Sequence, residues 1–386
     1  MVSITLGSAK LSARVTGRRI GLVANPASVD NSLHHIGDIV SSTPGVTLAA
    51  LFGPQHGFRS DVQDNMIETD HTNHPTLGIP VYSLYSETRE PTPDMLANLD
   101  VLVIDLQDVG TRVYTYIHTM TKCLKACGSH NIPVIICDRP NPIGGEAVEG
   151  PMLEPGFESF VGQFPIPLRH GLTIGELAIF CNETFELGAN LEVLQLDGWR
   201  RGFYHDNTGL PWVLPSPNLP TLDSSIVYPG MVLFEGTNLS EGRGTTRPFE
   251  LAGAPWLKAH QLAGLMNDLG LPGVLFRPVE FQPTFQKHAG QACGGCQLHV
   301  VDRRAFRPVV TAVALIQTCR HLAPEFFEWR QPPYEYEDVL PPIDILSGSD
   351  HLRHNIDAEV PYETIADAWT TGLDTFLPLR EHFLLY

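Results

Sequence analysis

Five short apolar runs dominate the first 140 residues, and each of them ends abruptly in polar or charged residues. They cover residues 19–25, 46–56, 79–85, 101–108 and 133–139. Runs rich in aliphatic and β-branched residues, without strict alternation, are typical of strands buried on both faces, as in a parallel sheet. Ligands of such sheets bind beyond the carboxyl ends of the strands. We therefore expect one sheet edge to gather the polar residues that end these runs: Asn25, Gln55, His56, Ser86, Glu87, Asp105, Asp108, Asp138 and Arg139.

Segments with helical spacing lie between these runs, at residues 30–40, 91–99 and 114–128. Strands that alternate with helices indicate βαβ units with right-handed crossovers. The pattern therefore predicts an α/β protein with a Rossmann-like three-layer domain and a mainly parallel sheet. We expect no nucleotide cofactor, because Asn25-Pro-Ala-Ser follows the first strand and no strand is followed by a glycine-rich phosphate loop.

The pattern of predicted strands, helices and loops changes in the second half of the sequence. Thr173 and Glu176 form a capping-box pattern that predicts a helix, and a strand candidate follows it at residues 191–196. Proline-rich loops then replace the regular alternation after about residue 210. We place a Rossmann-like catalytic domain at residues 1–160, extended to about 210 by this helix and strand. We expect residues 211–386 to form a smaller α+β auxiliary domain that closes the cleft.

Composition excludes several classes of partner. A formal net charge of −18 provides no cationic surface for nucleic acid or for anionic membranes. No apolar stretch approaches the roughly 20 residues that span a bilayer, and the amino terminus does not resemble a signal peptide. We therefore expect a cytoplasmic protein, or a secreted one if a signal has been removed. Cys293 and Cys296 form a single C-x-x-C without a second pair, so we expect reduced thiols and no metal.

Two stretches near the predicted sheet edge are candidates for chemistry. Residues 52–59 would project Gln55, His56 and Arg59 from a turn, although an ordinary βα turn has a similar composition. Residues 105–116 begin with an aspartate inside a buried strand, which is costly unless the carboxylate is paired. Arg112 lies close enough in sequence to pair with Asp105 or Asp108, so this stretch holds either a structural ion pair or a cleft carboxylate with a shifted pKa.

A third stretch, residues 234–250, combines acids, arginines, glycines and hydroxyl residues without helical or strand periodicity. Loops of this composition carry binding groups more often than they form cores, although a solvated surface loop is the alternative. Further polar residues, including Glu149 and Asn141, extend the same predicted sheet edge.

Motifs throughout the chain resemble the bacterial exo-β-N-acetylmuramidase family, the NamZ or YbbC-like proteins. The match runs from about residue 17 to 257 and more loosely to the carboxyl terminus, on FGPQHGF, PVYSLYSETREPTPDML, DLQDVGTRVYTYI, DRPNPIGG, VEGP, PLRHGLTIGELA and EGTNLSEGRGTTRPFELAGAPW. The resemblance implies a Rossmann-like domain, an auxiliary domain and an active cleft between them. It implies release of single N-acetylmuramic acid units from non-reducing ends of peptidoglycan fragments, in cell-wall turnover or recycling. It implies neither a metal nor a nucleotide, so we expect no cofactor. The expected partner is a sugar substrate, a glycan fragment that contains muramic acid.

The chain departs from the family at one position. Matching members commonly carry a glutamate, the favoured catalytic carboxylate, where this sequence has Gln55. An amide can neither donate a proton at neutral pH nor act as a nucleophile. Either Gln55 orients the acetamido or lactyl group while another residue is the catalytic acid, or the protein is a relative with weakened or altered activity. We hypothesise that Asp108, Glu149 and Glu241 supply the acid and its partner.

The remaining site predictions concern sugar binding. Arg112, Arg243 and Arg247 are predicted to bind the lactyl carboxylate, since guanidinium groups suit bidentate carboxylate recognition. The other predicted binding residues are His56, Tyr114 and Tyr116, which would line the sugar subsite, and Asn25, Arg59, Asp138, Arg139 and Asn141 at the sheet edge. A non-catalytic muropeptide- or amino-sugar-binding protein would use the same cleft. An oxidoreductase or nucleotide enzyme would share the fold but lacks the phosphate loop.

Overall fold

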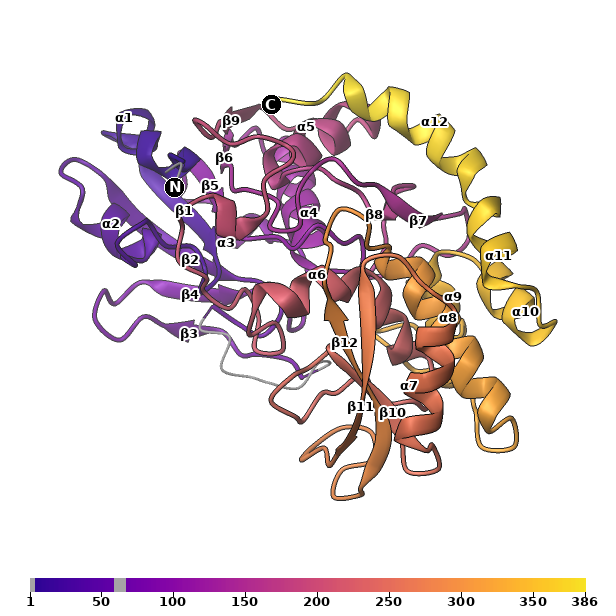
Figure 1. The fold of residues 1–386 in the computed structure, drawn as a ribbon. Helices are drawn as coiled ribbons and strands as arrows, with labels where there is room; N and C mark the ends of the chain where they lie inside the picture. The colour runs from indigo at the N-terminus through magenta and orange to yellow at the C-terminus, as the bar shows by residue number, and fades with distance from the viewer. Residues whose placement is uncertain (1–3, 59–66) are drawn as a thin grey trace.

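The computed structural model describes residues 4–58 and 67–386 (Figure 1). Its main sheet has the strand order β3-β4-β2-β1-β5-β6-β9. All neighbouring strands of this sheet are parallel except the short β3, which pairs antiparallel with β4. The strands are β1 (Arg19–Ala24), β2 (Thr47–Gly53), β3 (Thr72–Asn73), β4 (Pro80–Ser83), β5 (Val101–Asp105), β6 (Val134–Cys137) and β9 (Leu191–Leu194). The five predicted apolar runs all contain strands of this sheet, so the predicted parallel sheet is confirmed.

Helices cover both faces of the sheet, which makes three layers. Alternate residues of β5 face opposite ways: Val101 and Val103 pack in one apolar cluster with α2 (Ile36–Ser42), and Leu102 and Ile104 in another with α4 (Tyr116–Ser129) and α5 (Ile174–Thr184). Both faces are buried, which explains why the strand sequences are apolar without alternation. The short α1 (Ser12–Val15) lies on the α2 face, and α3 (Pro93–Leu96) precedes β5.

The predicted capping box forms at the start of α5. The Thr173 side chain accepts a hydrogen bond from the Glu176 amide, and the Glu176 carboxylate accepts one from the Thr173 amide. Between α4 and α5 the chain adds a small antiparallel pair, β7 (Glu149–Met152) and β8 (Pro167–Arg169).

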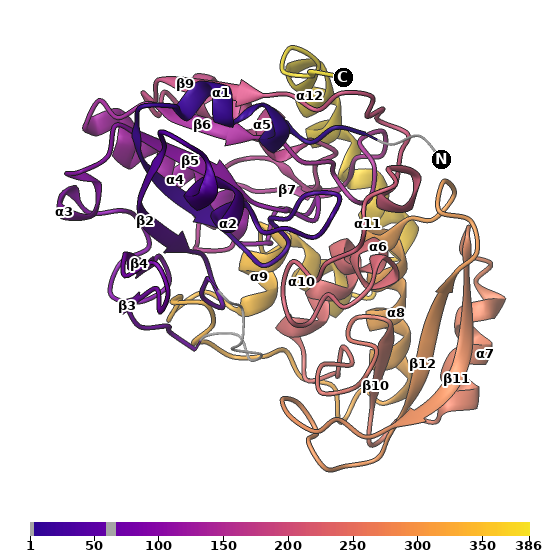
Figure 2. The same ribbon diagram turned by 90° about the vertical axis from the view of Figure 1, so that its left-hand side faces the viewer.

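The second half has its own antiparallel sheet in the order β10-β12-β11, with β10 (Leu251–Ala254), β11 (Val274–Phe281) and β12 (Cys293–Val300). Helix α7 (Ala259–Asp268) packs against it, α8 (Pro308–Leu322) packs on α7, and α6 (Leu222–Met231) packs on α8. Figure 2 shows the two sheets apart, with α6 and α9 (Pro342–Ser347) between them. This is the predicted α+β architecture beside the Rossmann-like layers. The predicted domain boundaries at residues 160 and 211 stay predictions.

The carboxyl-terminal helices return toward the first sheet. They are α10 (His351–Asp357), α11 (Tyr362–Ala368) and α12 (Thr370–Glu381), and Figure 1 shows α12 running back along the β7–β8 pair. Tyr386 then donates a hydrogen bond of 2.7 Å to Asp138 Oδ2, just after β6. Within residues 4–58 and 67–386, no helix combines the length and apolarity needed to cross a bilayer.

Candidate active site

A small polar pocket lies where the two halves of the chain meet. Its first wall comes from the turn after β2, with Gln55 and His56, and from the segment before α4, with Tyr114 and Thr115. The second wall comes from α6, from the 3-10 helix η3 (Val232–Gly236), from the glycine-rich loop and from the segment before α9. The residues of this wall include Tyr228, Glu235, Arg243, Phe249, Tyr334 and Glu335. Half of the pocket therefore lies at the carboxyl edge of the parallel sheet, where ligands of such folds bind.

The turn after β2 aims Gln55 at this junction. Gly57 donates a backbone hydrogen bond to Pro54, and His56 within the turn has a φ of 69°. A Cβ atom at Gly53 would lie 2.4 Å from the backbone nitrogen of Phe58, so the close turn requires glycine there. The FGPQHGF sequence thus fixes a compact turn whose glutamine side chain is buried.

The side chain of Gln55 is held at both ends. Its Oε1 accepts a hydrogen bond of 2.7 Å from the Thr115 hydroxyl. Its Nε2 donates to the Tyr85 hydroxyl oxygen and to Glu335 Oε1, each at 3.1 Å. The amide therefore presents its donor side to a carboxyl group that comes from the other half of the chain.

Glu335 is 3% exposed, and both of its carboxyl oxygens accept hydrogen bonds. The Tyr85 hydroxyl donates to Oε2 at 2.8 Å, opposite the Gln55 bond to Oε1. Burial, and next the negative charge of Glu235, raise the pKa of Glu335 to about 7, against the opposing effects of Tyr85, Gln55 and Arg243. Glu335 can therefore carry a proton near neutral pH.

Glu235 has the opposite electrostatic environment. Arg243 Nη2 donates to its Oε1 at 2.7 Å, and the Tyr334 hydroxyl donates to its Oε2 at 2.6 Å. Burial alone would raise the pKa of Glu235, but the Arg243 charge and these hydrogen bonds outweigh it and lower that pKa. Glu235 therefore stays ionised beside a carboxyl group that can hold a proton.

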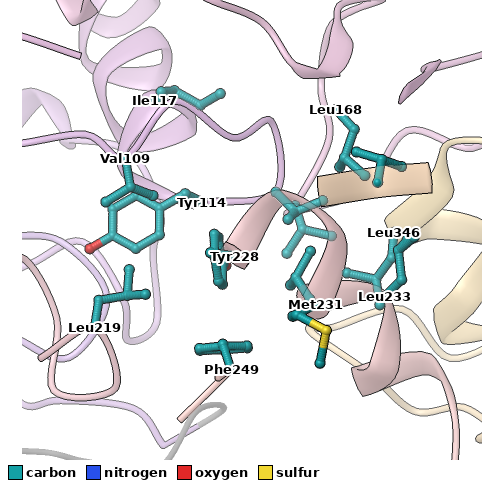
Figure 3. Packing of buried hydrophobic residues seen from close by; sticks show 14 of the residues in the cluster. Val109, Tyr114, Ile117, Leu168, Leu219, Tyr228, Met231, Leu233, Phe249 and Leu346 are labelled. Carbon is teal, nitrogen blue, oxygen red and sulfur yellow. The ribbon is translucent and has the colours of Figure 1, made fainter. Parts of the chain in front are cut away.

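Aromatic packing beneath the pocket joins the two halves. The Tyr228 ring on α6 meets Tyr114 at a centroid distance of 6.0 Å and Phe249 at 4.8 Å, both edge to face (Figure 3). The Arg243 guanidinium lies 5.0 Å from the centroid of the Phe249 ring. These contacts fix the floor of the pocket and orient the arginine that pairs with Glu235.

Four of the predicted site residues line this pocket: Gln55, His56, Tyr114 and Arg243. Arg59 lies outside the described residues. The other predicted residues that the structure describes do not line the pocket and bind other partners.

The three carboxylates proposed from the sequence do not line the pocket formed by the described residues. Asp108 Oδ2 accepts from the Gly110 amide at 2.7 Å. Glu149 Oε1 accepts from the amides of Val309 and Val310 at the start of α8, and burial raises the pKa of Glu149. Glu241 pairs with Lys287 at 2.8 Å and lies 3.4 Å from Arg243 Nε. Asp108 and Glu149 thus accept hydrogen bonds from backbone amides, and Glu241 places a negative charge next to Arg243.

The two other predicted lactyl ligands also have other roles. The guanidinium of Arg112 is fully buried and donates to the carbonyl oxygens of Pro151, Ile166, Leu346 and Ser347. Burial lowers the pKa of Arg112 to about 9. Arg247 is about half exposed and pairs with Glu250 at 3.2 Å.

The residues at the ends of β5 and β6 brace the sheet edge. Asp105 pairs in a buried salt bridge with Arg139 and not with Arg112, the partner considered from the sequence. Arg139 also donates to the Val29 carbonyl oxygen. Asp138 accepts hydrogen bonds from the Gly175 amide and the Thr173 and Tyr386 hydroxyls, and burial raises its pKa to about 7.

Three further predicted residues donate hydrogen bonds to backbone carbonyl oxygens of loops. Asn25 and Tyr116 both donate to the carbonyl oxygen of Pro215, at 3.1 and 2.8 Å, next to the pocket residue Ser216. Asn141 donates to the Leu172 carbonyl oxygen at 2.9 Å. Asn25 and Tyr116 thus position one wall of the pocket from behind.

Sequence reasoning did not select Glu235 or Glu335. Glu235 is one of three acids in the glycine-rich stretch, and the sequence-based hypothesis selected another of them, Glu241. Glu335 lies in a Pro-Pro-Tyr-Glu-Tyr-Glu segment, whose alternation of tyrosines and acids was the available signal. Among the described residues, no group of three or more histidine, cysteine, aspartate or glutamate side chains is arranged to hold a metal ion.

Comparisons with known proteins agree with this architecture. Residues 20–223 match the family model described as "Exo-beta-N-acetylmuramidase NamZ, N-terminal", and residues 226–386 match its C-terminal counterpart. A "Peptidoglycan beta-N-acetylmuramidase NamZ" from Bacillus subtilis (strain 168) is 47% identical over 97% of this chain and 88% of its own.

Two crystal structures of DUF1343 family proteins from Bacteroides fragilis NCTC 9343 share the fold. The first is 37% identical, with a TM-score of 0.91, and the match covers 100% of both chains. The second is 26% identical, with a TM-score of 0.78, covering 100% of this chain and 99% of the other. Taken with the two family models, which together span nearly the whole sequence, these likenesses show that this chain belongs to the exo-β-N-acetylmuramidase NamZ family.

Proposed function

We propose that this protein is an exo-β-N-acetylmuramidase, a glycosidase that releases N-acetylmuramic acid from the non-reducing ends of peptidoglycan fragments. Family membership and the Bacillus subtilis relative support the reaction class. The structural observation that carries the proposal is the pair of buried carboxyl groups, Glu235 and Glu335, in one pocket. Their environments push their pKa values in opposite directions.

Glycoside hydrolysis needs two carboxyl groups of this kind, one that carries a proton and one that is ionised. A proton must reach the leaving oxygen, and positive charge develops on the sugar ring in the transition state. Two carboxyl groups whose pKa values are pushed apart by their surroundings are the usual means of supplying both. Glu235, fixed by Arg243 and Tyr334, provides a negative charge that stabilises the ring as the glycosidic bond breaks.

Arg243 is the predicted lactyl ligand that faces this pocket. Its Nη2 donates to Glu235, and its Nε faces Glu241 Oε1 at 3.4 Å. We propose that the guanidinium group of Arg243 also binds the lactyl carboxylate, which distinguishes muramic acid from glucosamine. The cytoplasmic location and the recycling role stay predictions, which fractionation of the producing cells would test.

The substrate experiment compares para-nitrophenyl N-acetyl-β-muramide with para-nitrophenyl N-acetyl-β-glucosaminide, using the purified protein. We expect nitrophenol release from the muramide and little or none from the glucosaminide. Glu235→Gln should remove most of this activity, whereas the exposed Glu280→Gln on β11 should leave it unchanged.

A binding protein without catalysis is the second candidate, and the amide at Gln55 is the observation that favours it. Calorimetry with free N-acetylmuramic acid separates the two functions. Tight binding together with no hydrolysis of the muramide would replace the enzyme by the binding protein.

A further inference from the structure

The segment before α9 contains an unusual turn, formed by Tyr334, Glu335, Tyr336 and Glu337, which we call the acidic turn. The backbone of Tyr334 and that of Glu337 exchange two hydrogen bonds of 2.9 Å. The two central residues both have positive φ angles, 46° at Glu335 and 67° at Tyr336. Turns of this kind usually carry Asn-Gly, because residues with a side chain rarely adopt such angles. Backbone strain of this kind concentrates at functional sites.

The acidic turn belongs to the second half of the chain but is held by the first. Arg89 stacks on the Tyr336 ring, 3.5 Å from its centroid, and also pairs with Glu68 at 3.1 Å. The Tyr336 ring meets Tyr85 at 5.6 Å and Phe160 at 6.0 Å. These contacts fix the turn across the junction of the two halves and bring its central acid to the pocket.

Successive residues of the turn serve the two carboxyl sites. The Tyr334 hydroxyl binds Glu235, and the Glu335 carboxyl lies against Gln55 and Tyr85. The strained turn therefore places one acid in the pocket while it supports the ionised partner of that acid. This double role explains why the strained conformation would be kept.

On the basis of the proposed function, we propose that Glu335 is the catalytic proton donor of this protein. The carboxyl proton of Glu335 passes to the glycosidic oxygen as the bond from the anomeric carbon to that oxygen breaks, and the bonding electrons leave with the oxygen. A water molecule then adds its hydroxyl to the anomeric carbon and returns its proton to the Glu335 carboxylate. The products are N-acetylmuramic acid and the shortened glycan.

The neighbours of Glu335 explain why it takes this role here. Residue 55 is a glutamine, and its amide cannot donate a proton at neutral pH. Glu235 is ionised through Arg243. Gln55 and Tyr85 are positioning residues, because each donates to one oxygen of Glu335 and together they fix the plane of the carboxyl group.

The charged and titratable groups around Glu335 include Tyr85, Glu235 and Arg243, and also Tyr228 and Tyr334. Burial and the charge of Glu235 keep its pKa near 7, whereas Tyr85 and Arg243 oppose that rise. The activity of the wild-type protein should therefore fall as the pH rises above about 7, where Glu335 loses its proton.

The test compares Glu335→Gln with the matched control Glu337→Gln, two residues away on the same turn. Glu337 is partly exposed, and its carboxylate accepts two backbone hydrogen bonds that a glutamine oxygen can also accept. Each variant is assayed on the muramic acid–glucosamine disaccharide, whose leaving group needs protonation, and on the para-nitrophenyl muramide, whose leaving group needs it far less.

We expect Glu335→Gln to lose about 100-fold to 10,000-fold in kcat on the disaccharide and much less on the nitrophenyl substrate. Any activity that remains on the disaccharide should also lose the decline above about pH 7. Glu337→Gln should behave as the wild type does on both substrates. Because the ratio of the two rates comes from one preparation, partial misfolding does not alter it.

An equal loss on both substrates, or full activity of Glu335→Gln on the disaccharide, would overturn the assignment while leaving the glycosidase function intact. Absence of turnover by the wild-type protein would instead overturn the proposed function itself. The two failures are therefore distinguishable.

Discussion

Gln55 Nε2 lies 3.1 Å from Glu335 Oε1, and this hydrogen bond joins residues that are 280 positions apart in the sequence. It connects the turn after the second strand of the Rossmann-like sheet to the acidic turn of the other half. A buried amide is therefore paired with a buried carboxyl group whose pKa is raised to about 7.

Replacing Gln55 by glutamate should shift the pH dependence upward. The variant would place a second carboxyl group within hydrogen-bond distance of Glu335, and two such groups cannot easily ionise together. The pKa of the pair should rise, so the decline in kcat/KM should move to higher pH while activity is kept. The measurement is a pH profile on the disaccharide. Gln291→Glu, an exposed change of the same charge, is the control, and an unmoved profile would contradict the role of this contact.

Replacing Tyr85 by phenylalanine should also move the decline to higher pH. The Tyr85 hydroxyl donates to Glu335 Oε2 and thereby lowers the pKa of that group, so its removal raises the pKa. We expect kcat to fall as well, because one oxygen of the carboxyl group loses its support. Tyr82→Phe, in the neighbouring strand β4, should change neither quantity. A fall in kcat without a shift in pH dependence would assign Tyr85 a purely structural role.

The stability of the protein should depend on Glu335 with a definite sign. Its folded-state pKa of about 7 lies above the ordinary value of 4.5, so the folded protein binds more protons between these pH values. Stability contributed by this group is therefore present below about pH 4.5 and declines as the pH rises toward 7. Urea unfolding at several pH values gives the free energy of unfolding of each protein. Across this window, that of Glu335→Gln should rise relative to that of the wild type by up to about 3 kcal/mol. A constant difference between the two proteins would contradict the raised pKa.

Arg112 and Arg247 offer a matched pair of arginine substitutions. Replacing Arg112 by alanine leaves four backbone carbonyl oxygens without their buried donor, which should lower the free energy of unfolding by about 3–5 kcal/mol. Replacing Arg247, which is half exposed, should cost less than about 0.5 kcal/mol. Denaturant unfolding measures both. Similar stabilities, with a raised KM for the Arg112 variant alone, would instead support the lactyl role predicted from the sequence.

The fold could be predicted from local sequence because its strands and helices have local causes. The apolar runs of β5 and β6 follow from burial on both faces, and the Thr173–Glu176 capping box fixes the start of α5. Polar residues after the strands were correctly expected at one edge. Their individual partners could not be read from the sequence, so Asp105 and Arg139, a buried ion pair, were not distinguished from pocket residues.

On the second wall of the pocket, Arg243 was the residue predicted from the sequence, and the two acids were missed. Gln55 and His56 follow a strand in a recognisable glycine-rich turn, whereas Glu335 reaches them through the docking of a distant segment. The acidic turn lacks the glycine and asparagine that mark such turns, so it has no local turn signal. The pKa shifts could not be predicted from the sequence either, because the pKa of Glu235 depends on Arg243 and Tyr334 in the folded protein.

The most direct test of the whole account is product analysis by mass spectrometry, with the purified protein and a peptidoglycan glycan fragment labelled at its reducing end. We expect free, unlabelled N-acetylmuramic acid to appear first, one unit for each shortened chain. Cleavage within the glycan, release of labelled ends, or binding without any product would contradict the account.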